Sequence, residues 1–180
     1  MKIALVRHGQ TEENYLGNIQ GLRNEMLNDT GRRQCQRLRE KIKDVSFDFC
    51  YMSPLVRAVE TAIILVGERV ETFADKRLIE RDMGNLEGTS RDNYDGEKYW
   101  NWELNSNDDG VESIQSMFER CQEFLNYVYD KHKGESILIV SHSATYRVLR
   151  HLILNHELKG NLLDTIIPNC SYEEFIIEDK

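Results

Sequence analysis

Runs of apolar residues recur along the chain between segments with helical spacing. The two strongest runs are "KIALV" (2–6) and "SILIVS" (136–141), which are short, mostly apolar and end abruptly at polar residues. Such runs are typical of strands that are buried on both faces of a parallel sheet. Weaker strand-like segments lie at 47–53, 70–73 and 171–178.

Other segments carry apolar residues at the period of an α-helix. The spacing predicts helices at 29–43, 55–66, 113–132 and 144–155. Asn28 is placed to cap the first of these helices, and Pro54 is well suited to open the second.

Strands that alternate with helices predict an α/β fold, a three-layer sandwich with a mostly parallel central sheet and helices on both faces. We expect residues 1–180 to form a single domain. Residues 82–112 have no sustained period and are rich in Gly, Asn, Asp and aromatic residues, which predicts an irregular, lid-like segment. In folds of this class the ligand binds beyond the carboxyl ends of the strands.

Composition narrows the possible partners. The formal net charge is −8, from 31 acidic and 23 basic residues, so we expect neither nucleic acid nor a membrane as a partner. An anionic ligand therefore needs a local cationic pocket. No apolar stretch approaches the ~20 residues of a membrane span, and "MKIALVRHG" turns polar too early for a signal peptide, so we expect a cytoplasmic protein. Nothing in the pattern indicates an oligomeric state.

The four cysteines are Cys35, Cys50, Cys121 and Cys170, and they lie far apart in the sequence. Their spacing matches neither a zinc site nor a redox pair. We interpret them as reduced and mostly buried thiols.

The two strongest strands both end at a histidine, His8 in "LVRHG" and His142 in "IVSHS". The carboxyl ends of parallel strands meet at one edge of a sheet, so these histidines are expected on one rim. Arg7 precedes His8, and Arg57 lies in the first turn of the predicted helix at 55–66, whose N-terminus favours anions.

This combination suits a phosphoryl group. Guanidinium groups stay charged and hold phosphoryl oxygens in a fork, while a neutral imidazole nitrogen is a nucleophile near neutral pH. A single histidine at a strand end is more often a structural residue. Two histidines on one rim beside arginines favour a catalytic or phosphate-binding role. A metal held by His8 and His142 is disfavoured, because no third ligand has suitable spacing and the arginines oppose a cation.

Several motifs occur in an order that resembles one known family. "LVRHGQT", "SPLVRAVET", "LIERDMGNLEG" and "IVSHS", with "NYLGNIQG" and "PNCSYEEF", are similar to motifs of the histidine phosphatase superfamily, also called phosphoglycerate mutase-like, in its phosphatase branch. The resemblance covers nearly the whole chain. It implies that His8 takes up the phosphoryl group as a phosphohistidine, that Arg7, Arg57 and His142 form the phosphate pocket, and that no metal or other cofactor takes part.

The same resemblance implies substrate or phosphate contacts from the first loop. The matching residues there are Thr11, Asn14, Gln20 and Gly21. Asn and Gly are also ordinary turn residues, so a purely structural role is the alternative at these positions.

A leaving alcohol needs a proton, so a carboxylic acid is expected near His8. The family's acid matches Glu80, with Asp82 and Glu87 as the local competitors. Ser143 and Ala144 stand where relatives commonly have two glycines, which removes the conformational freedom of glycine. A phosphate contact from residue 143 is therefore open between its amide and its hydroxyl, which could substitute for the amide.

These observations predict a metal-independent phosphomonoesterase of the histidine acid phosphatase type, acting on a small phosphorylated metabolite. The alternatives are a phosphoglycerate mutase-type phosphoryl transfer and a non-catalytic phosphate-binding domain. Residues 89–113 carry 7 acidic residues against only Arg91 and Lys98, which disfavours the mutase, and the pairing of His8 with Glu80 argues against a binding-only domain. The aromatic residues of this segment are expected to form either a lid or packing anchors; they are Tyr94, Tyr99, Trp100 and Trp102.

Overall fold

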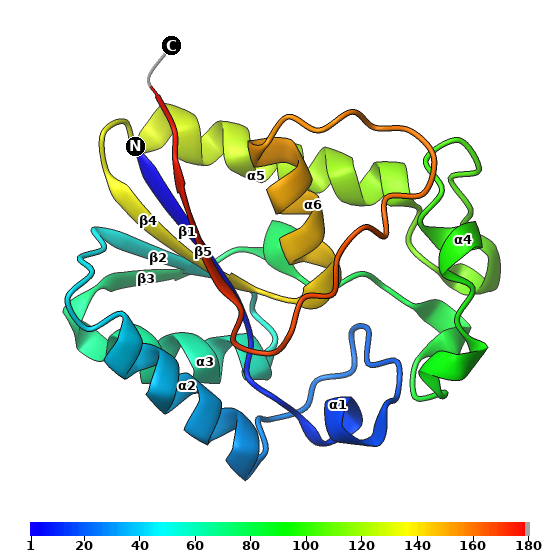
Figure 1. Ribbon diagram of the computed structural model, residues 1–180, viewed down its shortest axis with the longest axis horizontal. Helices are drawn as coiled ribbons and strands as arrows, with labels where there is room; N and C mark the ends of the chain where they lie inside the picture. Colours follow the sequence, from blue (N-terminus) through cyan, green and yellow to red (C-terminus); the bar gives the residue numbers. More distant parts are fainter. Residues whose placement is uncertain (179–180) are drawn as a thin grey trace.

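A computed structural model describes residues 1–178 of the chain. Residues 179 and 180, which end the domain predicted for 1–180, lie outside the described residues. The central sheet has the strand order β3-β2-β4-β1-β5, and β1, β2, β3 and β4 run parallel while β5 is antiparallel to β1 (Figure 1). The strands are β1 (Lys2–Arg7), β2 (Phe49–Met52), β3 (Glu71–Ala74), β4 (Ser136–Ser141) and β5 (Tyr172–Ile176).

Helices cover both faces of the sheet, which confirms the predicted three-layer architecture (Figure 1). One face packs against α2 (Asp29–Lys41) and α3 (Val56–Val66), and the other packs against α5 (Ile114–Lys131) and α6 (Ser143–Ile153). Side chains of a strand point alternately to the two faces, so neighbouring residues of one strand enter different cores. Ile3 and Leu5 of β1 join the α5–α6 core, whereas Ala4 joins the α2–α3 core.

The helix boundaries agree closely with the apolar spacing. Asn28 caps α2 as predicted, because its side chain accepts a hydrogen bond from the N–H of Gly31 at 2.8 Å. The helix after Pro54 begins at Val56 rather than at the proline, with Leu55 in the capping position. A short helix, α1 (Glu12–Leu16), was not predicted, since it buries none of its residues and has no apolar stripe to reveal it.

Residues 82–112 contain short 3-10 turns and the single-turn helix α4 (Gly96–Tyr99), as their lack of a period predicts. Three of their aromatic residues make ring contacts within the protein. Trp102 packs edge-on against Phe118 of α5, with ring centroids 5.3 Å apart, and Tyr99 stacks on Tyr94 at 5.5 Å. Within residues 1–178, no helix is long and apolar enough to span a membrane. The four cysteines are unpaired.

The loop that follows β1 packs directly on the backbone of α2. A Cβ atom on Gly31 would lie 2.1 Å from the carbonyl oxygen of Gln10, and a Cβ on Gly9 would lie 2.7 Å from the carbonyl oxygen of Gly31. Both contacts are with backbone atoms, which cannot move aside as a flexible side chain would. Glycine at these two positions therefore fixes the path of the chain immediately after His8.

Gly31→Ala is expected to lower the free energy of unfolding by about 1–3 kcal/mol, because the added methyl group forces α2 away from the loop at 8–10. Urea unfolding monitored by circular dichroism measures this effect. Gln36→Ala, on the exposed side of the same helix, is the matched control and should leave the midpoint almost unchanged. Equal midpoints for the two variants would show that the close approach does not constrain the loop.

Candidate active site

The adjacent strands β1 and β4 bring the two predicted histidines together. Arg7 pairs in register with Ser141, and the N–H of His8 donates to the carbonyl oxygen of Ser141 at 2.9 Å. The chain leaves the sheet after Arg7 in β1 and after Ser141 in β4. The rings of His8 and His142 have centroids 5.1 Å apart, and both side chains are almost fully buried. The structure thus brings His8 and His142 to one rim, as the strand ends indicate.

His8 is held in a defined orientation. Its Nδ1 lies 2.7 Å from the carbonyl oxygen of Gly9, and a carbonyl can only accept, so Nδ1 carries the hydrogen of the neutral ring. Nε2 then retains the lone pair. Burial, followed by the nearby charges of Arg57 and Arg7, lowers the pKa of His8 well below its ordinary value. The imidazole is therefore neutral at neutral pH, as a nucleophile must be.

Arg57 and His142 lie behind this ring. The Nε of Arg57 donates to Nδ1 of His142 at 3.1 Å, and its two terminal nitrogens donate to the carbonyl oxygens of Arg23 at 2.7 Å and Gly21 at 2.8 Å. Nε2 of His142 lies 2.7 Å from the hydroxyl of Ser53. Neither Arg57 nor His142 lines the cavity in front of His8. Each terminal nitrogen of Arg57 still has a second N–H available, so its predicted contact with phosphate stays a prediction.

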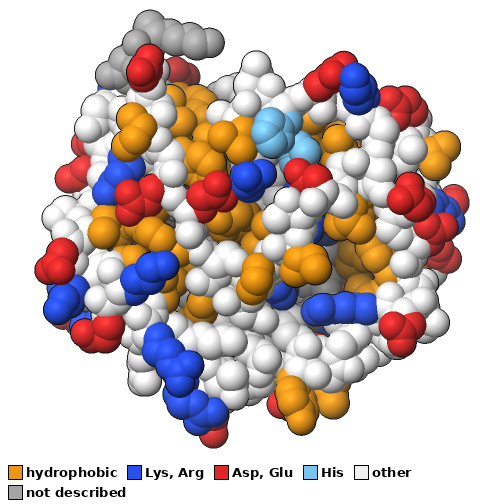
Figure 2. Space-filling model, in the orientation of Figure 1, with side chains coloured by type: hydrophobic (Ala, Val, Ile, Leu, Met, Phe, Trp, Pro, Cys, Tyr) orange, Lys and Arg blue, Asp and Glu red, His pale blue; other side chains and the backbone are white. Residues whose placement is uncertain are grey.

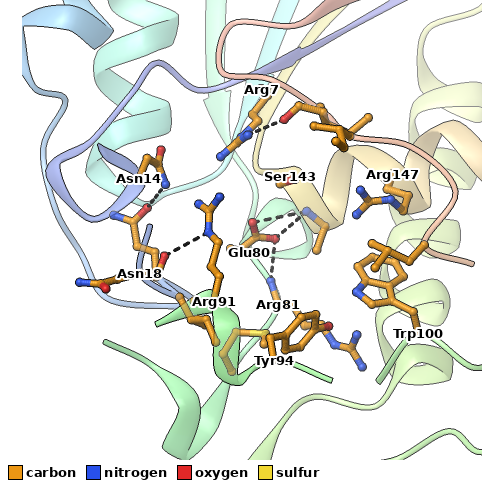
Figure 3. A pocket seen from close by; sticks show the side chains of 18 of the residues that line it. Arg7, Asn14, Asn18, Glu80, Arg81, Arg91, Tyr94, Trp100, Ser143 and Arg147 are labelled. Carbon is orange, nitrogen blue, oxygen red and sulfur yellow. Dashed lines mark hydrogen bonds between the residues drawn. The ribbon is translucent and has the colours of Figure 1, made fainter. Parts of the chain in front are cut away.

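Arg7 lines the cavity beside His8. One terminal nitrogen donates to the carbonyl oxygen of Ile167, which fixes the guanidinium on the C-terminal segment (Figure 3). Burial lowers the pKa of Arg7 to about 10, and it does the same for Arg57. Both side chains remain cationic at neutral pH, so the rim offers two buried positive charges to an anion.

Glu80 reaches the same cavity from the segment that follows β3. Its Oε1 accepts from the backbone N–H of Ala144 at 3.1 Å and of Arg81 at 2.9 Å (Figure 3). The first of these donors belongs to the N-terminal turn of α6, which favours negative charge. Ser143, the first residue of α6, also lines the cavity, so the amide of residue 144 binds Glu80 while residue 143 borders the open space.

The two competing carboxylates have other partners. Asp82 accepts from the N–H of Gly84 at 2.8 Å and closes a turn, and Glu87 accepts from the N–H of Leu22 at 2.6 Å. Among the residues that the structure describes, Glu80 is the one carboxylate in the cavity lining.

The first-loop residues play different parts. Asn14 and Gln20 line the cavity, and Gly21 does so while its carbonyl oxygen holds Arg57. Thr11 does not line it. Its side chain is fully buried, caps α1 by accepting from the N–H of Asn14, and donates to the side chain of Gln20 at 3.3 Å. Thr11 therefore lies buried outside the cavity lining as the cap of α1, and its predicted contact with substrate stays a prediction.

The cavity has a volume of about 290 Å³ and is open at one side (Figures 2 and 3). Several lining residues were not predicted to form part of the site. They are Asn18, Ile19, Arg81, Met83, Arg91, Ala144, Arg147, Leu163, Ile166 and Ile167, whereas Tyr94 and Trp100 were candidates for a lid. Arg147 follows Ser143 by one helical turn, a spacing that places both on one helix face and was available in the sequence.

A possible metal-ligand group lies elsewhere. The ligand atoms of His151, His156 and Asp164 lie within 4.8 Å of one another. None of these three residues belongs to the cavity lining, whereas His8 and His142 are flanked by arginines. The chemistry available at the cavity is therefore that of a neutral nucleophile, a carboxyl group and fixed cations.

Comparison with known proteins identifies the family. Residues 3–180 match the histidine phosphatase superfamily (branch 1), and the chain belongs to this family. It is 36% identical to phosphoglycerate mutase-like protein 4 of Arabidopsis thaliana over 158 residues, 82% of this chain and 69% of that protein. It is 31% identical to phosphoserine phosphatase 1 of Hydrogenobacter thermophilus over 188 residues, 100% of this chain and 88% of that protein.

A solved structure agrees with this assignment. YhfR of Bacillus stearothermophilus superposes with a TM-score of 0.87 at 26% identity, covering 98% of this chain and 91% of that one. The predicted family and fold are both confirmed.

The buried histidines predict how stability depends on pH. The pKa of His142, like that of His8, is lowered well below its ordinary value by burial and then by Arg57. The unfolded chain takes up protons near pH ~6.5 while the folded chain does not, so the free energy of unfolding falls as the pH drops below that value. Each such histidine contributes up to about 1.4 kcal/mol per pH unit.

Urea unfolding between about pH 7.5 and 5.5 measures this dependence, in a range above the titration of ordinary carboxyl groups. His142→Gln removes one titrating group and should flatten the slope, whereas Gln36→Ala, at an exposed position, should leave it close to wild type. A slope unchanged in His142→Gln would mean that this histidine takes up a proton in the folded state.

Proposed function

We propose that this protein is a phosphomonoesterase of the histidine acid phosphatase type, which works through a phosphohistidine on His8 without a metal ion. The observation that carries the proposal is the state of His8, which lines a cavity with Arg7 and Glu80. Its imidazole is buried and neutral, its Nδ1 is bound to the carbonyl oxygen of Gly9, and its Nε2 has no hydrogen-bond partner within residues 1–178. Nucleophile, cation and carboxyl group are the parts that a metal-independent phosphoryl transfer requires.

In the first half-reaction, Nε2 of His8 attacks the phosphorus atom and the bond from phosphorus to the ester oxygen breaks. The leaving oxygen takes the proton of the Glu80 carboxyl group and departs as an alcohol. Arg7 stabilises the negative charge on the oxygens of the transferring phosphoryl group. Arg57, which lies close enough to His8 to lower its pKa, adds a second positive charge near these oxygens. The carbonyl oxygen of Gly9 accepts from Nδ1 throughout, which keeps Nε2 as the reacting nitrogen.

In the second half-reaction, the ionised Glu80 removes a proton from a water molecule that attacks the phosphohistidine. The bond between phosphorus and Nε2 breaks, the imidazole returns to its neutral form, and inorganic phosphate leaves. Glu80 is protonated again, so the cycle closes with one ester and one water consumed.

The substrate of the proposal is a small phosphorylated metabolite. Support comes from the size of the cavity and from relatives, which include a phosphoserine phosphatase and a phosphoglycerate mutase-like protein. The proposal includes a cytoplasmic location. We prefer phosphatase activity to mutase activity because residues 89–113 are predominantly acidic.

The test is phosphate release from a panel of phosphomonoesters in chelator-treated buffer, with His8→Ala in parallel. Release by the wild type alone, undiminished by the chelator, is expected. Release that requires an added divalent cation would overturn the metal-independent mechanism. Isomerised phosphoester without net phosphate release would identify a mutase, and ester binding without either product would identify a binding domain.

A further inference from the structure

The end of α6 brings two histidines together outside the cavity. The helix stops at a left-handed residue, Asn155, whose φ is 53°. The N–H of Asn155 donates to the carbonyl oxygen of Leu152 at 3.2 Å, and the N–H of His156 donates to that of His151 at 3.0 Å. This is the Schellman arrangement, which brings the side chains at its two ends into contact and usually pairs apolar residues there. Here both are histidines, with ring centroids 5.1 Å apart.

His151 is the buried member of this pair. Only 5% of its surface is exposed, and its ring lies against that of Phe118, with centroids 6.1 Å apart. Within residues 1–178, neither of its ring nitrogens has a hydrogen-bond partner. A buried polar side chain without a partner is unfavourable, and a bound metal ion can satisfy the free lone pair of a neutral imidazole.

Asp164 brings a carboxylate to the same place from the segment between α6 and β5. Its Oδ2 lies 3.4 Å from Nε2 of His151. Two ligand atoms of a tetrahedral Zn²⁺ ion, each about 2.0–2.1 Å from the metal, lie about 3.4 Å from one another. The ligand atoms of His151, His156 and Asp164 all lie within 4.8 Å of one another. His156 is exposed, so a rotation of its side chain can bring its ring into ligand distance.

The surroundings allow a cation, although Arg147 is close. The Nε of Arg147 lies 3.7 Å from Oδ1 of Asp164, which is the other carboxylate oxygen. A metal bound to Oδ2 therefore leaves Oδ1 to Arg147, and carboxylates that bind metals commonly have such a second partner. His151 also lies in the last turn of α6, where the partial negative charge of the helix end favours a cation.

We propose that His151, His156 and Asp164 bind a divalent transition-metal ion of the Zn²⁺ class, with water in the fourth position. Two imidazoles and a carboxylate suit Zn²⁺, whereas Mg²⁺ and Ca²⁺ prefer oxygen ligands alone. None of the three residues lines the cavity, so this site is separate from the phosphate chemistry of His8. On the face drawn in Figure 2, histidine side chains gather at the surface over the C-terminal end of α6.

The role of the ion is structural. It joins the end of α6 to the segment at 163–167, which supplies part of the cavity wall through Leu163, Ile166 and Ile167. The folded chain gathers the three ligands and the unfolded chain does not, so metal binding stabilises the folded state. The proposed phosphatase reaction needs no metal, and the inference does not depend on it.

The test is calorimetric titration of the metal-stripped protein with Zn²⁺ at about pH 7.5, where an ordinary histidine is neutral, in buffer with excess Mg²⁺. The wild type is expected to bind one Zn²⁺ ion per chain, and the bound ion should raise the urea midpoint. His156→Gln and Asp164→Asn should each weaken binding by about 100-fold or more, because losing a ligand costs more than losing an outer-shell partner.

Both changes are at exposed positions, so the fold should survive them. Glu157→Gln is the matched control, because Glu157 is the exposed neighbour of His156 and pairs with Lys159 at 2.7 Å. This variant should bind Zn²⁺ as the wild type does.

A thiol variant identifies the ligand directly. His156→Cys replaces an imidazole with a side chain that also binds this class of ion. With Co²⁺ as the probe, this variant should show a sulfur-to-cobalt charge-transfer absorption that the wild type lacks. Glu157→Cys adds a thiol one residue away and should not show it.

Absence of saturable Zn²⁺ binding by the wild type would overturn the inference. Wild-type affinity in both His156→Gln and Asp164→Asn would overturn it too, since the ion would then bind elsewhere. Phosphate release in chelator-treated buffer would leave the proposed function in place in either case. Phosphate release that depends on added Zn²⁺ would instead reject the metal-independent mechanism, so the two claims fail separately.

Discussion

His8→Ala is expected to lower kcat/KM for phosphate release by at least about 10³-fold, because no other group can replace the attacking nitrogen. His142 is the nearest imidazole, but both of its ring nitrogens are engaged, with Arg57 at 3.1 Å and Ser53 at 2.7 Å. Arg7 cannot lose a proton to become a nucleophile. Continuous detection of inorganic phosphate with an alkyl phosphate ester measures the loss.

The loss must be separated from damage to the fold. His8 is buried beside Arg57, so its removal leaves a small space next to a buried positive charge. The variant should keep a cooperative urea transition and should still bind inorganic phosphate through Arg7. Turnover by a folded His8→Ala variant within tenfold of the wild-type rate would reject His8 as the nucleophile.

Glu80→Gln is expected to lower kcat/KM for alkyl phosphates by about 10²–10³-fold, with a much smaller effect on 4-nitrophenyl phosphate. The amide oxygen of glutamine can still accept from Ala144 and Arg81, so the local structure is preserved. What the variant lacks is the proton for the leaving oxygen. A nitrophenolate leaves without that proton, whereas an alkoxide does not.

Two features make this comparison specific. The ratio kcat/KM reports the steps up to departure of the alcohol, so the later attack of water does not enter. Asp82→Asn changes a neighbouring carboxylate that closes a turn with Gly84, and it should affect both esters equally and weakly. The same fractional loss on alkyl and aryl esters in Glu80→Gln would show that another group is the acid.

The fold could be predicted because local and global signals agree in it. β1 and β4 are buried on both faces, so they read as continuous apolar runs, and the helices that cover them keep a clear apolar stripe. α1 escaped prediction because it buries none of its residues.

The rim of the site was equally predictable, since adjacent parallel strands must bring their carboxyl ends together. Whether each site residue lines the cavity or lies behind it was not predictable from the sequence. Arg57 and His142 lie behind His8, and Thr11 caps a helix, because their side chains find protein partners that no spacing rule reveals.

The remaining wall of the cavity depends on contacts between distant segments. Leu163, Ile166 and Ile167 come from the irregular segment between α6 and β5, and no pattern in the sequence joins them to the rim. Arg91 was counted as a minor exception in an acidic segment, although its side chain lines the cavity. Composition averaged over a segment does not report which side chain faces a cavity.

The most direct test of the central claim is to trap the phosphorylated enzyme. Wild-type protein mixed with excess ester is denatured within one turnover under alkaline conditions, where a phosphorus–nitrogen bond survives, and its peptides are analysed by mass spectrometry. The account predicts one added phosphoryl group on His8, and none in the His8→Ala variant. A phosphoryl group found on another residue, or none at all while phosphate is being released, would contradict it.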